Sequence, residues 1–236
     1  MHRFFVETVG EEAVLEGEEF LHAKNVLRIT EGEEVILLDN SAYEYTAVVT
    51  QIGKKSLSLH VLGRAISDKE AKTKVCLLFG YLKNADKNEF IVQKAVELGV
   101  SEIVAFSSRY SSAYMNENKL ERLNKVAKEA AKQCGRSSFP RVVYEGEWQG
   151  ALARASEYEN KLFACEFASE SEISLRGMVG STVLAVGSEG GFSSEEAELA
   201  SAMGFRTISL GKRILRAETA AIALSSVVMY ELGELQ

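Results

Sequence analysis

Residues that bind metals or form cross-links are scarce in this chain, which has three cysteines and three histidines among 236 residues. The cysteines lie far apart, each in a predicted strand or helix, which indicates reduced thiols in a cytosolic protein and excludes a disulfide framework or a zinc site: Cys76, Cys134 and Cys165. The histidines are equally scattered, so the sequence predicts no metal site: His2, His22 and His60.

Long apolar runs and prolines are also missing. No stretch approaches the roughly 20 apolar residues that cross a membrane, and the N-terminus from Met1 to Phe5 lacks the apolar core of a signal peptide. The single proline, Pro140, leaves glycine and polar residues to shape the loops. With 46% hydrophobic and 26% charged residues, the chain is expected to bury a core and to be a soluble cytoplasmic protein.

A net charge of -7 argues against indiscriminate nucleic-acid binding. The stretch 119–141 is an exception, because it holds seven basic residues and only two acidic ones. Most of the basic residues recur at spacings of three and four, which places them along one helix face. Such a stripe is either a solvated helix surface or a place where a phosphate backbone docks.

Two regions with different patterns divide the chain, whose length allows one large domain or two small ones. Residues 1–70 are predicted to form a small β-barrel, and the polar stretch 67–72 is the predicted linker. The barrel's strands are expected at 3–8, 33–38, 45–51 and 56–62, interrupted by one helix at 18–27.

Strands and helices alternate in the rest of the chain, which is typical of an α/β domain with a largely parallel sheet covered on both faces. Gly99 and Gly204 occupy expected helix C-cap positions, and Ser193 with Glu196 forms an expected capping box. The predicted strands are 75–81, 103–106, 141–144, 162–166, 182–186 and 206–210, and the predicted helices are 87–98, 117–134, 148–156, 195–203 and 217–232.

Two glycine-containing loops follow two of these strands, at 187–192 and 210–220, and each leads into a helix. Ligands of open α/β sheets bind at the carboxyl ends of strands, so these loops, taken as lying at neighbouring strand ends, are the predicted site. Common nucleotide motifs fail on spacing. Glu189 stands where a dinucleotide motif needs glycine, Arg206 and Arg213 break a P-loop, and no nucleophile elbow surrounds Ser188. A pocket edged by backbone remains, suited to an adenine ring and a ribose without a triphosphate.

Several motifs in order along the chain resemble the SPOUT methyltransferases, and among them the ribosomal small subunit methyltransferase E family, the 16S rRNA (uracil-N3)-methyltransferases. The resemblance covers most of the chain. It rests on His22 with Val26-Leu27-Arg28, on Asp86-Lys87 with Glu89, Gln93-Lys94 and Glu97-Leu98-Gly99-Val100, on 129–136, and on the two C-terminal loops.

The resemblance implies a PUA-like β-barrel RNA-binding domain at 1–70 and a SPOUT methyltransferase domain at 73–236, whose parallel sheet ends in a trefoil knot. It also implies S-adenosylmethionine as methyl donor, a homodimer, and 16S rRNA of the small ribosomal subunit as substrate. The cofactor residues implied are Gly187, Ser188, Gly190, Leu210, Gly211, Ile214 and Leu215; the implied RNA-binding residues are Arg3, His22, Arg28, Lys87, Gln93, Lys94, Lys132 and Arg136.

Arg216 is the first candidate to act on the reacting base, because a guanidinium near uracil O2 or O4 would stabilise negative charge on the ring. A structural pair with Glu189 or Glu218 is the alternative. Glu218 is a second catalytic candidate, able to accept the N3 proton if burial raises its pKa, or else an ordinary first-turn helix residue. Leu210 and Leu215 could equally be plain core.

The chain departs from the family's usual residues in a few places. Ser188 and Lys212 stand where proline is usual, Ala217 where threonine is common, Asn84-Ala85 in place of Lys-Gly, and Ser108 in place of a frequent glutamate. Two other functions stay open: ribose 2'-O methylation by another SPOUT enzyme, and a non-catalytic RNA-binding assembly factor.

Overall fold

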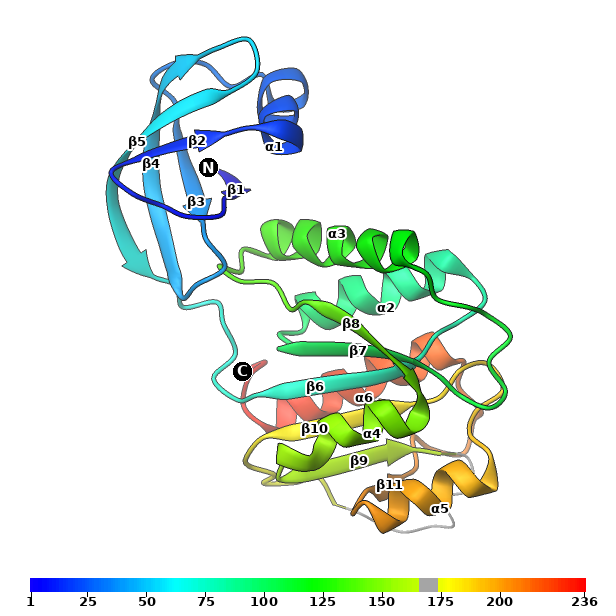
Figure 1. The fold of residues 1–236 in the computed structure, drawn as a ribbon. Coiled ribbons are helices and arrows are strands. Elements are labelled where there is room, and N and C mark those ends of the chain that lie inside the picture. The colour runs from blue at the N-terminus through cyan, green and yellow to red at the C-terminus, as the bar shows by residue number, and fades with distance from the viewer. Residues whose placement is uncertain (166–173) are drawn as a thin grey trace. The chain divides into compact units, whose positions relative to one another are not determined.

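A computed structural model describes residues 1–165 and 174–236 and groups them in two compact units (Figure 1). The first unit is Met1–Glu70 with Ala131–Phe139, and the second is Ala71–Ala130 with Pro140–Gln236. A nine-residue segment at the end of a long helix therefore groups with the N-terminal residues.

A curled five-stranded sheet forms the first unit, in the order β1-β3-β4-β5-β2. Strand β1 runs parallel to β3, and the other pairings are antiparallel. The sheet encloses an apolar core led by Phe4, Leu15, Leu37 and Leu59, all at most 1% exposed. The strands are β1 (His2–Phe5), β2 (Glu12–Leu15), β3 (Glu34–Leu38), β4 (Tyr43–Ile52) and β5 (Leu57–Ile66).

The four strands predicted for this unit are confirmed, with ends shifted by a few residues, and β2 is an additional strand that the sequence analysis missed. Its four residues are too few to show a clear alternation. The predicted helix is confirmed as α1 (Gly17–Leu21) followed by a π-helix, η1 (His22–Leu27). The expected barrel is a curled sheet whose edges are β1 and β2, and the pairings within the described residues do not join these two strands.

Six parallel strands form the sheet of the second unit, in the order β11-β9-β10-β6-β7-β8. Every predicted strand and helix of this region is confirmed; the strand predicted at 162–166 ends at Ala164, and Glu166 lies outside the described residues. The strands are β6 (Val75–Gly80), β7 (Glu102–Ser107), β8 (Val142–Glu147), β9 (Asn160–Ala164), β10 (Thr182–Val186) and β11 (Arg206–Ile208). The helices are α2 (Ala85–Glu97), α3 (Glu117–Cys134), α4 (Trp148–Arg154) with the 3-10 turn η2 (Ala155–Glu157), α5 (Ser194–Ala202) and α6 (Ala217–Glu231).

Local capping signals place the helix ends where the sequence predicts them. Gly99 and Gly204 adopt positive φ angles of 93° and 84°, which glycine reaches without a Cβ penalty. At the start of α5, the Ser193 side chain accepts the Glu196 backbone N–H while the Glu196 carboxylate accepts that of Ser193. These two backbone N–H groups, which have no carbonyl partner within the helix, are thereby satisfied.

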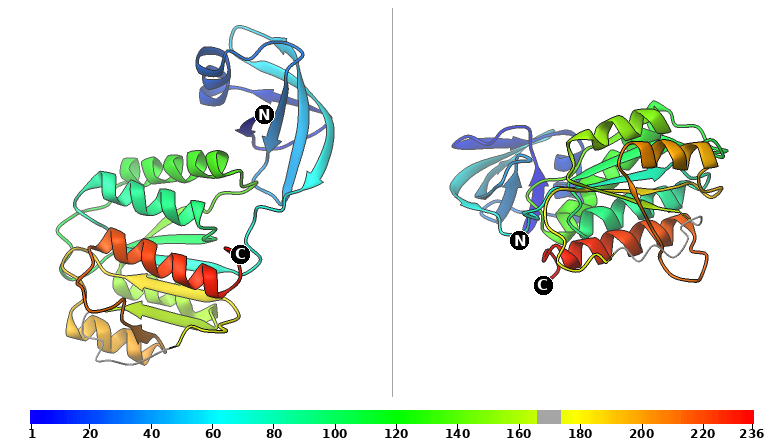
Figure 2. Two further views of the ribbon diagram at one scale, coloured as in Figure 1. Left: turned by 180° about the vertical axis from the view of Figure 1, so that it is seen from behind. Right: turned by 90° about the horizontal axis from the view of Figure 1, so that it is seen from below.

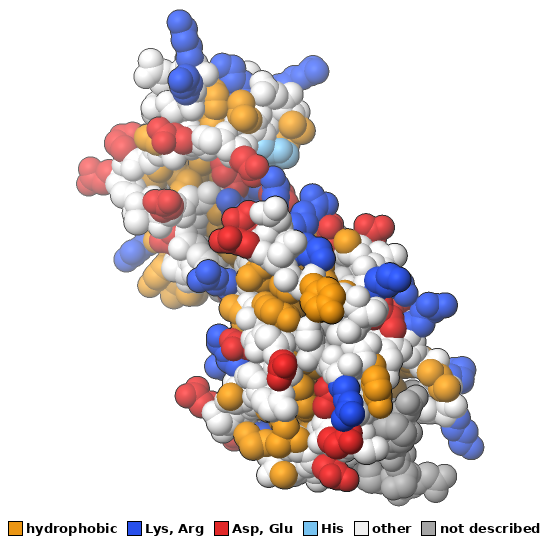
Figure 3. All heavy atoms as spheres, turned by 45° about the vertical axis from the view of Figure 1, so that its right-hand side comes forward, with side chains coloured by type: hydrophobic (Ala, Val, Ile, Leu, Met, Phe, Trp, Pro, Cys, Tyr) orange, Lys and Arg blue, Asp and Glu red, His pale blue; other side chains and the backbone are white. Residues whose placement is uncertain are grey.

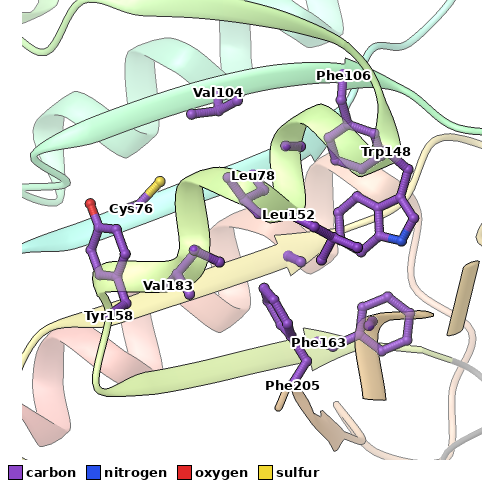
Figure 4. Close-up of a cluster of buried hydrophobic side chains, with 14 of the residues drawn as sticks. Cys76, Leu78, Val104, Phe106, Trp148, Leu152, Tyr158, Phe163, Val183 and Phe205 are labelled. Atoms are coloured by element: carbon purple, nitrogen blue, oxygen red, sulfur yellow. The ribbon is translucent and has the colours of Figure 1, made fainter. Parts of the chain in front are cut away.

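Helices cover both faces of the parallel sheet, with α4 and α5 on one face and α2 and α6 on the other (Figure 2). The α4–α5 face encloses an aromatic cluster around Trp148, whose ring centroid lies 4.7 Å from that of Phe106 and 5.0 Å from that of Phe192 (Figure 4). The Trp148 indole N–H donates to the Glu196 carbonyl at 3.0 Å, so this buried polar atom is satisfied. The cluster fixes α5 and the loop before it on the sheet.

Basic and acidic side chains are interspersed on the molecular face of Figure 3, without a broad field of one sign. No helix in the described part of the chain is both long and apolar enough to span a membrane.

Candidate functional site

A cavity of about 690 Å³ opens at the carboxyl edge of the parallel sheet. Its walls are the first loop (residues 187–193), the second loop (residues 209–216), the ends of β9, β10 and β11, and the start of α6. This volume lies within the range of cofactor and small-molecule sites.

The strands that carry the two loops are not neighbours, which corrects the expectation from the sequence. β9 lies between β10 and β11, and its last residue, Ala164, lines the cavity together with Cys165, which follows it. From β10 the chain passes through α5 to β11, which pairs with the other side of β9 and forms the edge of the sheet. Strand ends separated in this way leave a gap between the loops, and that gap is the cavity.

Ten of the 17 predicted site residues line this cavity. They include both catalytic candidates, Arg216 and Glu218, and one RNA candidate, Lys87. The other seven are all the predicted cofactor residues: Gly187, Ser188, Gly190, Leu210, Gly211, Ile214 and Leu215.

The first loop packs tightly against the end of β6. A Cβ on Gly80 would overlap the backbone nitrogen of Ser188 and lie 2.8 Å from the carbonyl carbon of Gly187. A Cβ on Gly190 would lie 2.5 Å from the Cβ of Tyr110. These glycines therefore let three backbone segments approach one another and set the loop's position. The sequence analysis missed Gly80, although a glycine ending a buried strand signals close backbone approach.

A network of serine hydroxyls links the first loop to the segment that follows β7. Ser108 and Ser188 are 6% and 5% exposed, and their Oγ atoms lie 2.8 Å apart. The Ser108 Oγ also lies 3.1 Å from that of Ser111. Glu196 adds a further tie by accepting the backbone N–H of Arg109 at 2.8 Å. Ser108 and Ser188 are two of the chain's departures from the family's usual residues, and they contact each other.

We predict that Ser108→Ala destabilises the protein by about 1–3 kcal/mol, because it leaves the buried Ser188 hydroxyl without this partner. The double variant Ser108→Ala/Ser188→Ala should lose less than the sum of the two single variants. Urea unfolding measures all three. Ser201→Ala, at an exposed position of α5, is the control and should change stability by less than about 0.5 kcal/mol. Additive losses would contradict the pairing.

The second loop turns at Gly211, whose φ of 101° requires glycine. Leu210 and Leu215 are half-buried and line the cavity, so they are not plain core. Ile214 is 90% exposed at the cavity's edge. The loop therefore offers apolar surface to the cavity without burying it against the fold.

Arg216 is exposed at the N-cap of α6 and makes no ion pair within the described residues. Neither alternative partner holds it. The Glu189 carboxylate accepts the Lys83 backbone N–H at 2.9 Å, and Glu218 pairs with Lys87 at 2.7 Å between Oε1 and Nζ. The guanidinium is therefore available to a ligand in the cavity.

Glu218 does not have the raised pKa that would make it a proton acceptor. Burial alone would raise its pKa, but the hydrogen bond from Lys87, the backbone N–H and the charges of Lys87 and Arg216 together hold the pKa below its ordinary value. Its second oxygen, Oε2, is buried without a hydrogen-bond partner in the described structure. The condition for Glu218 as general base is therefore not met in this form of the site.

The Lys87–Glu218 pair predicts a pH-dependent stability. A carboxyl whose folded-state pKa is depressed stabilises fully above its unfolded pKa, and the gain is lost as pH falls through the folded-state pKa. Lys87→Met should therefore cost about 1–3 kcal/mol at pH 7 and much less at an acidic pH below the folded-state pKa of Glu218. Urea unfolding at both values measures this. Lys83→Met, an exposed lysine, is the control, and an equal loss at both pH values would contradict the pair's role.

Most predicted RNA-binding cations are already paired with acids inside the fold. Arg136 is 4% exposed and its guanidinium donates to Glu70, whose pKa stays below its usual range despite burial, through Arg136 and the backbone N–H of Ser138. Similar pairs join Arg3 to Glu44, Lys132 to Glu19 and Lys94 to Glu97.

The remaining RNA candidates differ from these. Arg28 is exposed, makes no ion pair among the described residues and has a φ of 55°, unusual for a residue with a side chain. His22 and Gln93 are half-buried. The basic stripe of α3 is likewise occupied: the Arg122 guanidinium binds Glu89 at 2.9 Å, and Lys125 and Lys128 also have partners.

Acidic, histidine and cysteine side chains of the described residues form no cluster of three or more suited to a metal ion.

Comparison with models of known protein families shows the class of protein to which this chain belongs. A family model described as an RNA methyltransferase domain matches residues 69–229, and one described as an RNA methyltransferase PUA domain matches residues 15–62. The fold and cavity are thus those of an RNA methyltransferase with an N-terminal PUA domain.

Individual relatives identify the family within this class of RNA methyltransferases. The ribosomal RNA small subunit methyltransferase E of Bacillus subtilis is 33% identical over 98% of this chain and 97% of its own length. The crystal structure of the same enzyme from Neisseria gonorrhoeae, bound to S-adenosyl methionine, superposes with a TM-score of 0.86 at 28% identity, covering 98% of each chain. A Legionella pneumophila methyltransferase with bound SAM gives 0.87 at 27% identity, over 97% of this chain and 96% of that one. The chain belongs to the ribosomal RNA small subunit methyltransferase E family.

Proposed function

We propose that this protein transfers the methyl group of S-adenosylmethionine to N3 of a specific uridine in 16S rRNA of the small ribosomal subunit. The observation that carries the proposal is the single cavity that gathers all seven cofactor candidates with Arg216 and Glu218. The Bacillus subtilis and Neisseria gonorrhoeae relatives, with the cofactor bound to the latter, support the same reaction.

The residues around the cavity suit S-adenosylmethionine. The backbone of Gly187 and Gly190 lines the cavity where a ribose can bind, and Leu210 and Leu215 offer half-buried apolar surface to an adenine ring. When bound, the cofactor supplies an electrophilic methyl group on a sulfonium. The protein's task is to hold N3 in line with that methyl, and such orientation contributes about 7–11 kcal/mol in favourable cases.

Arg216 completes the chemistry on the uracil side. N3 becomes nucleophilic only when its proton leaves to solvent water, and the resulting negative charge on the ring spreads to O2 and O4. The unpaired Arg216 guanidinium can donate to one of these oxygens and stabilise the charge as it forms. Glu218, paired with Lys87, serves in this proposal to position the start of α6 and not to take the proton.

The path of the chain supports a trefoil knot, which we propose for its C-terminal third. After β11 at the sheet edge, the chain returns through the second loop to α6, which packs on β10 and β6. We further propose a PUA-like domain at 1–70, a SPOUT methyltransferase domain at 73–236, a homodimer, and a cytoplasmic location where ribosomal subunits are found.

The RNA-binding set stays a prediction: Arg3, His22, Arg28, Lys87, Gln93, Lys94, Lys132 and Arg136. Of its members, Arg28 is best placed for direct contact, because it is exposed and unpaired among the described residues. Direct contact by Arg136 would require breaking its pair with Glu70.

Incubation with labelled S-adenosylmethionine and small ribosomal subunits that lack the modification, followed by nucleoside analysis, tests the function. Label on N3 of uridine supports the proposal. Label on a ribose 2'-hydroxyl would assign the protein to the other SPOUT activity. An unlabelled product with intact subunit binding would indicate a non-catalytic assembly factor.

A further inference from the structure

Positive charge without a partner is concentrated at the mouth of the cavity. Four of the residues that line the cavity are cationic and two are acidic. Both acids are engaged elsewhere, Glu218 with Lys87 and Glu189 with the Lys83 backbone. This leaves three exposed cations of the second loop, none with an ion pair in the described part of the chain: Lys212, Arg213 and Arg216.

Lys212 and Arg213 have no task in the proposed chemistry. They follow Gly211, whose positive φ turns the chain at this point, and both are exposed while lining the cavity, so they stand at its mouth. In a protein of net charge -7, where Arg122 and Lys132 of α3 are paired with Glu89 and Glu19, the unpaired cations at the mouth of the cavity are suited to bind a polyanion.

We propose that Lys212 and Arg213 bind phosphates of the RNA backbone next to the target base, so that the second loop holds substrate as well as cofactor. The inference rests on the proposed function, because it takes RNA to be the substrate at this cavity. A base that enters the cavity brings its flanking phosphates to the mouth, and a lysine beside an arginine can neutralise two of them.

Binding to unmodified small ribosomal subunits, with the full chain and saturating S-adenosylhomocysteine over a series of salt concentrations, tests the proposal. Each neutralised phosphate of a single strand adds about 0.7 to the slope of log K against log salt. Lys212→Gln/Arg213→Gln should therefore lower the magnitude of the slope by about 1.4. Affinity at low salt should fall at least tenfold. Lys212→Arg should keep the slope of the wild type.

The matched control is Arg176→Gln/Arg206→Gln, which removes the same charge from two other exposed cations of the second unit. Neither Arg176 nor Arg206 lines the cavity. This control should keep the wild-type slope. An equal decrease in both double variants would overturn the proposal in favour of a general charge effect.

Calorimetry with S-adenosylmethionine tests the alternative that Lys212 and Arg213 bind the cofactor and not the RNA. The proposal expects the Lys212→Gln/Arg213→Gln variant to bind the cofactor within threefold of wild type. A tenfold loss with an unchanged salt slope would assign the two cations to the cofactor's carboxylate and overturn the proposal. A lowered slope in the variant while the wild type transfers no methyl would sustain this inference and defeat the proposed reaction.

Discussion

Arg216→Ala is expected to abolish methyl transfer while leaving the cofactor bound. The guanidinium lines the cavity and makes no ion pair within the described residues, so its removal takes little from the fold. It would remove the group that stabilises negative charge on the uracil, and loss of one such donor typically lowers kcat by about 10²–10³. Single-turnover transfer to unmodified small subunits measures the rate, and calorimetry with S-adenosylhomocysteine measures binding.

Arg216→Lys is the matched variant for this test. It keeps the charge but loses the planar fork of donors, so we expect part of the rate to return. Turnover equal to wild type in Arg216→Ala would remove this residue from the mechanism. A parallel loss of cofactor affinity would instead place the guanidinium on the cofactor.

Gly80→Ala should displace the first loop and thereby weaken cofactor binding, because Gly80 packs against the backbone of that loop. The new methyl group would overlap the backbone nitrogen of Ser188, and backbone cannot yield as a flexible side chain does. We expect the loop to shift, with at least a tenfold loss of S-adenosylhomocysteine affinity and a stability loss of about 1–3 kcal/mol. Calorimetry and urea unfolding measure the two effects.

Gly63→Ala is the control for Gly80→Ala. Gly63 lies in β5, and a Cβ at this position meets no atom within 4 Å. Both variants make the same chemical change inside a strand, so cofactor binding should be lost only in Gly80→Ala. Wild-type affinity in both would show that the contact between β6 and the first loop does not shape the cavity.

Local signals were sufficient to predict the second unit's elements. The short, mostly apolar run 182–186 is confirmed as β10, and the capping box at Ser193 begins α5 where it was expected. The first unit was harder, because β2 is only four residues long. Spacing along the chain also could not show that β9 separates the strands that carry the two loops, since strand order depends on the path of the connections.

The cavity's residues could be predicted, but their partners could not. The resemblance identified the lining, including Arg216 and Glu218, because these residues lie in two continuous motifs. The Lys87–Glu218 pair and the Ser108–Ser188 contact join residues far apart in the sequence. A basic stripe such as that of α3 looks the same in sequence whether or not acids from other elements neutralise it.

A crystal structure of the protein with S-adenosylhomocysteine tests the central claim most directly. The account predicts density in the cavity between the first and second loops, with the adenine against Leu210 and Leu215 and the ribose beside the backbone of the first loop. The sulfur of S-adenosylhomocysteine should lie in the part of the cavity that Arg216 lines. Density at another place on the protein, or none at a saturating concentration, would contradict the account.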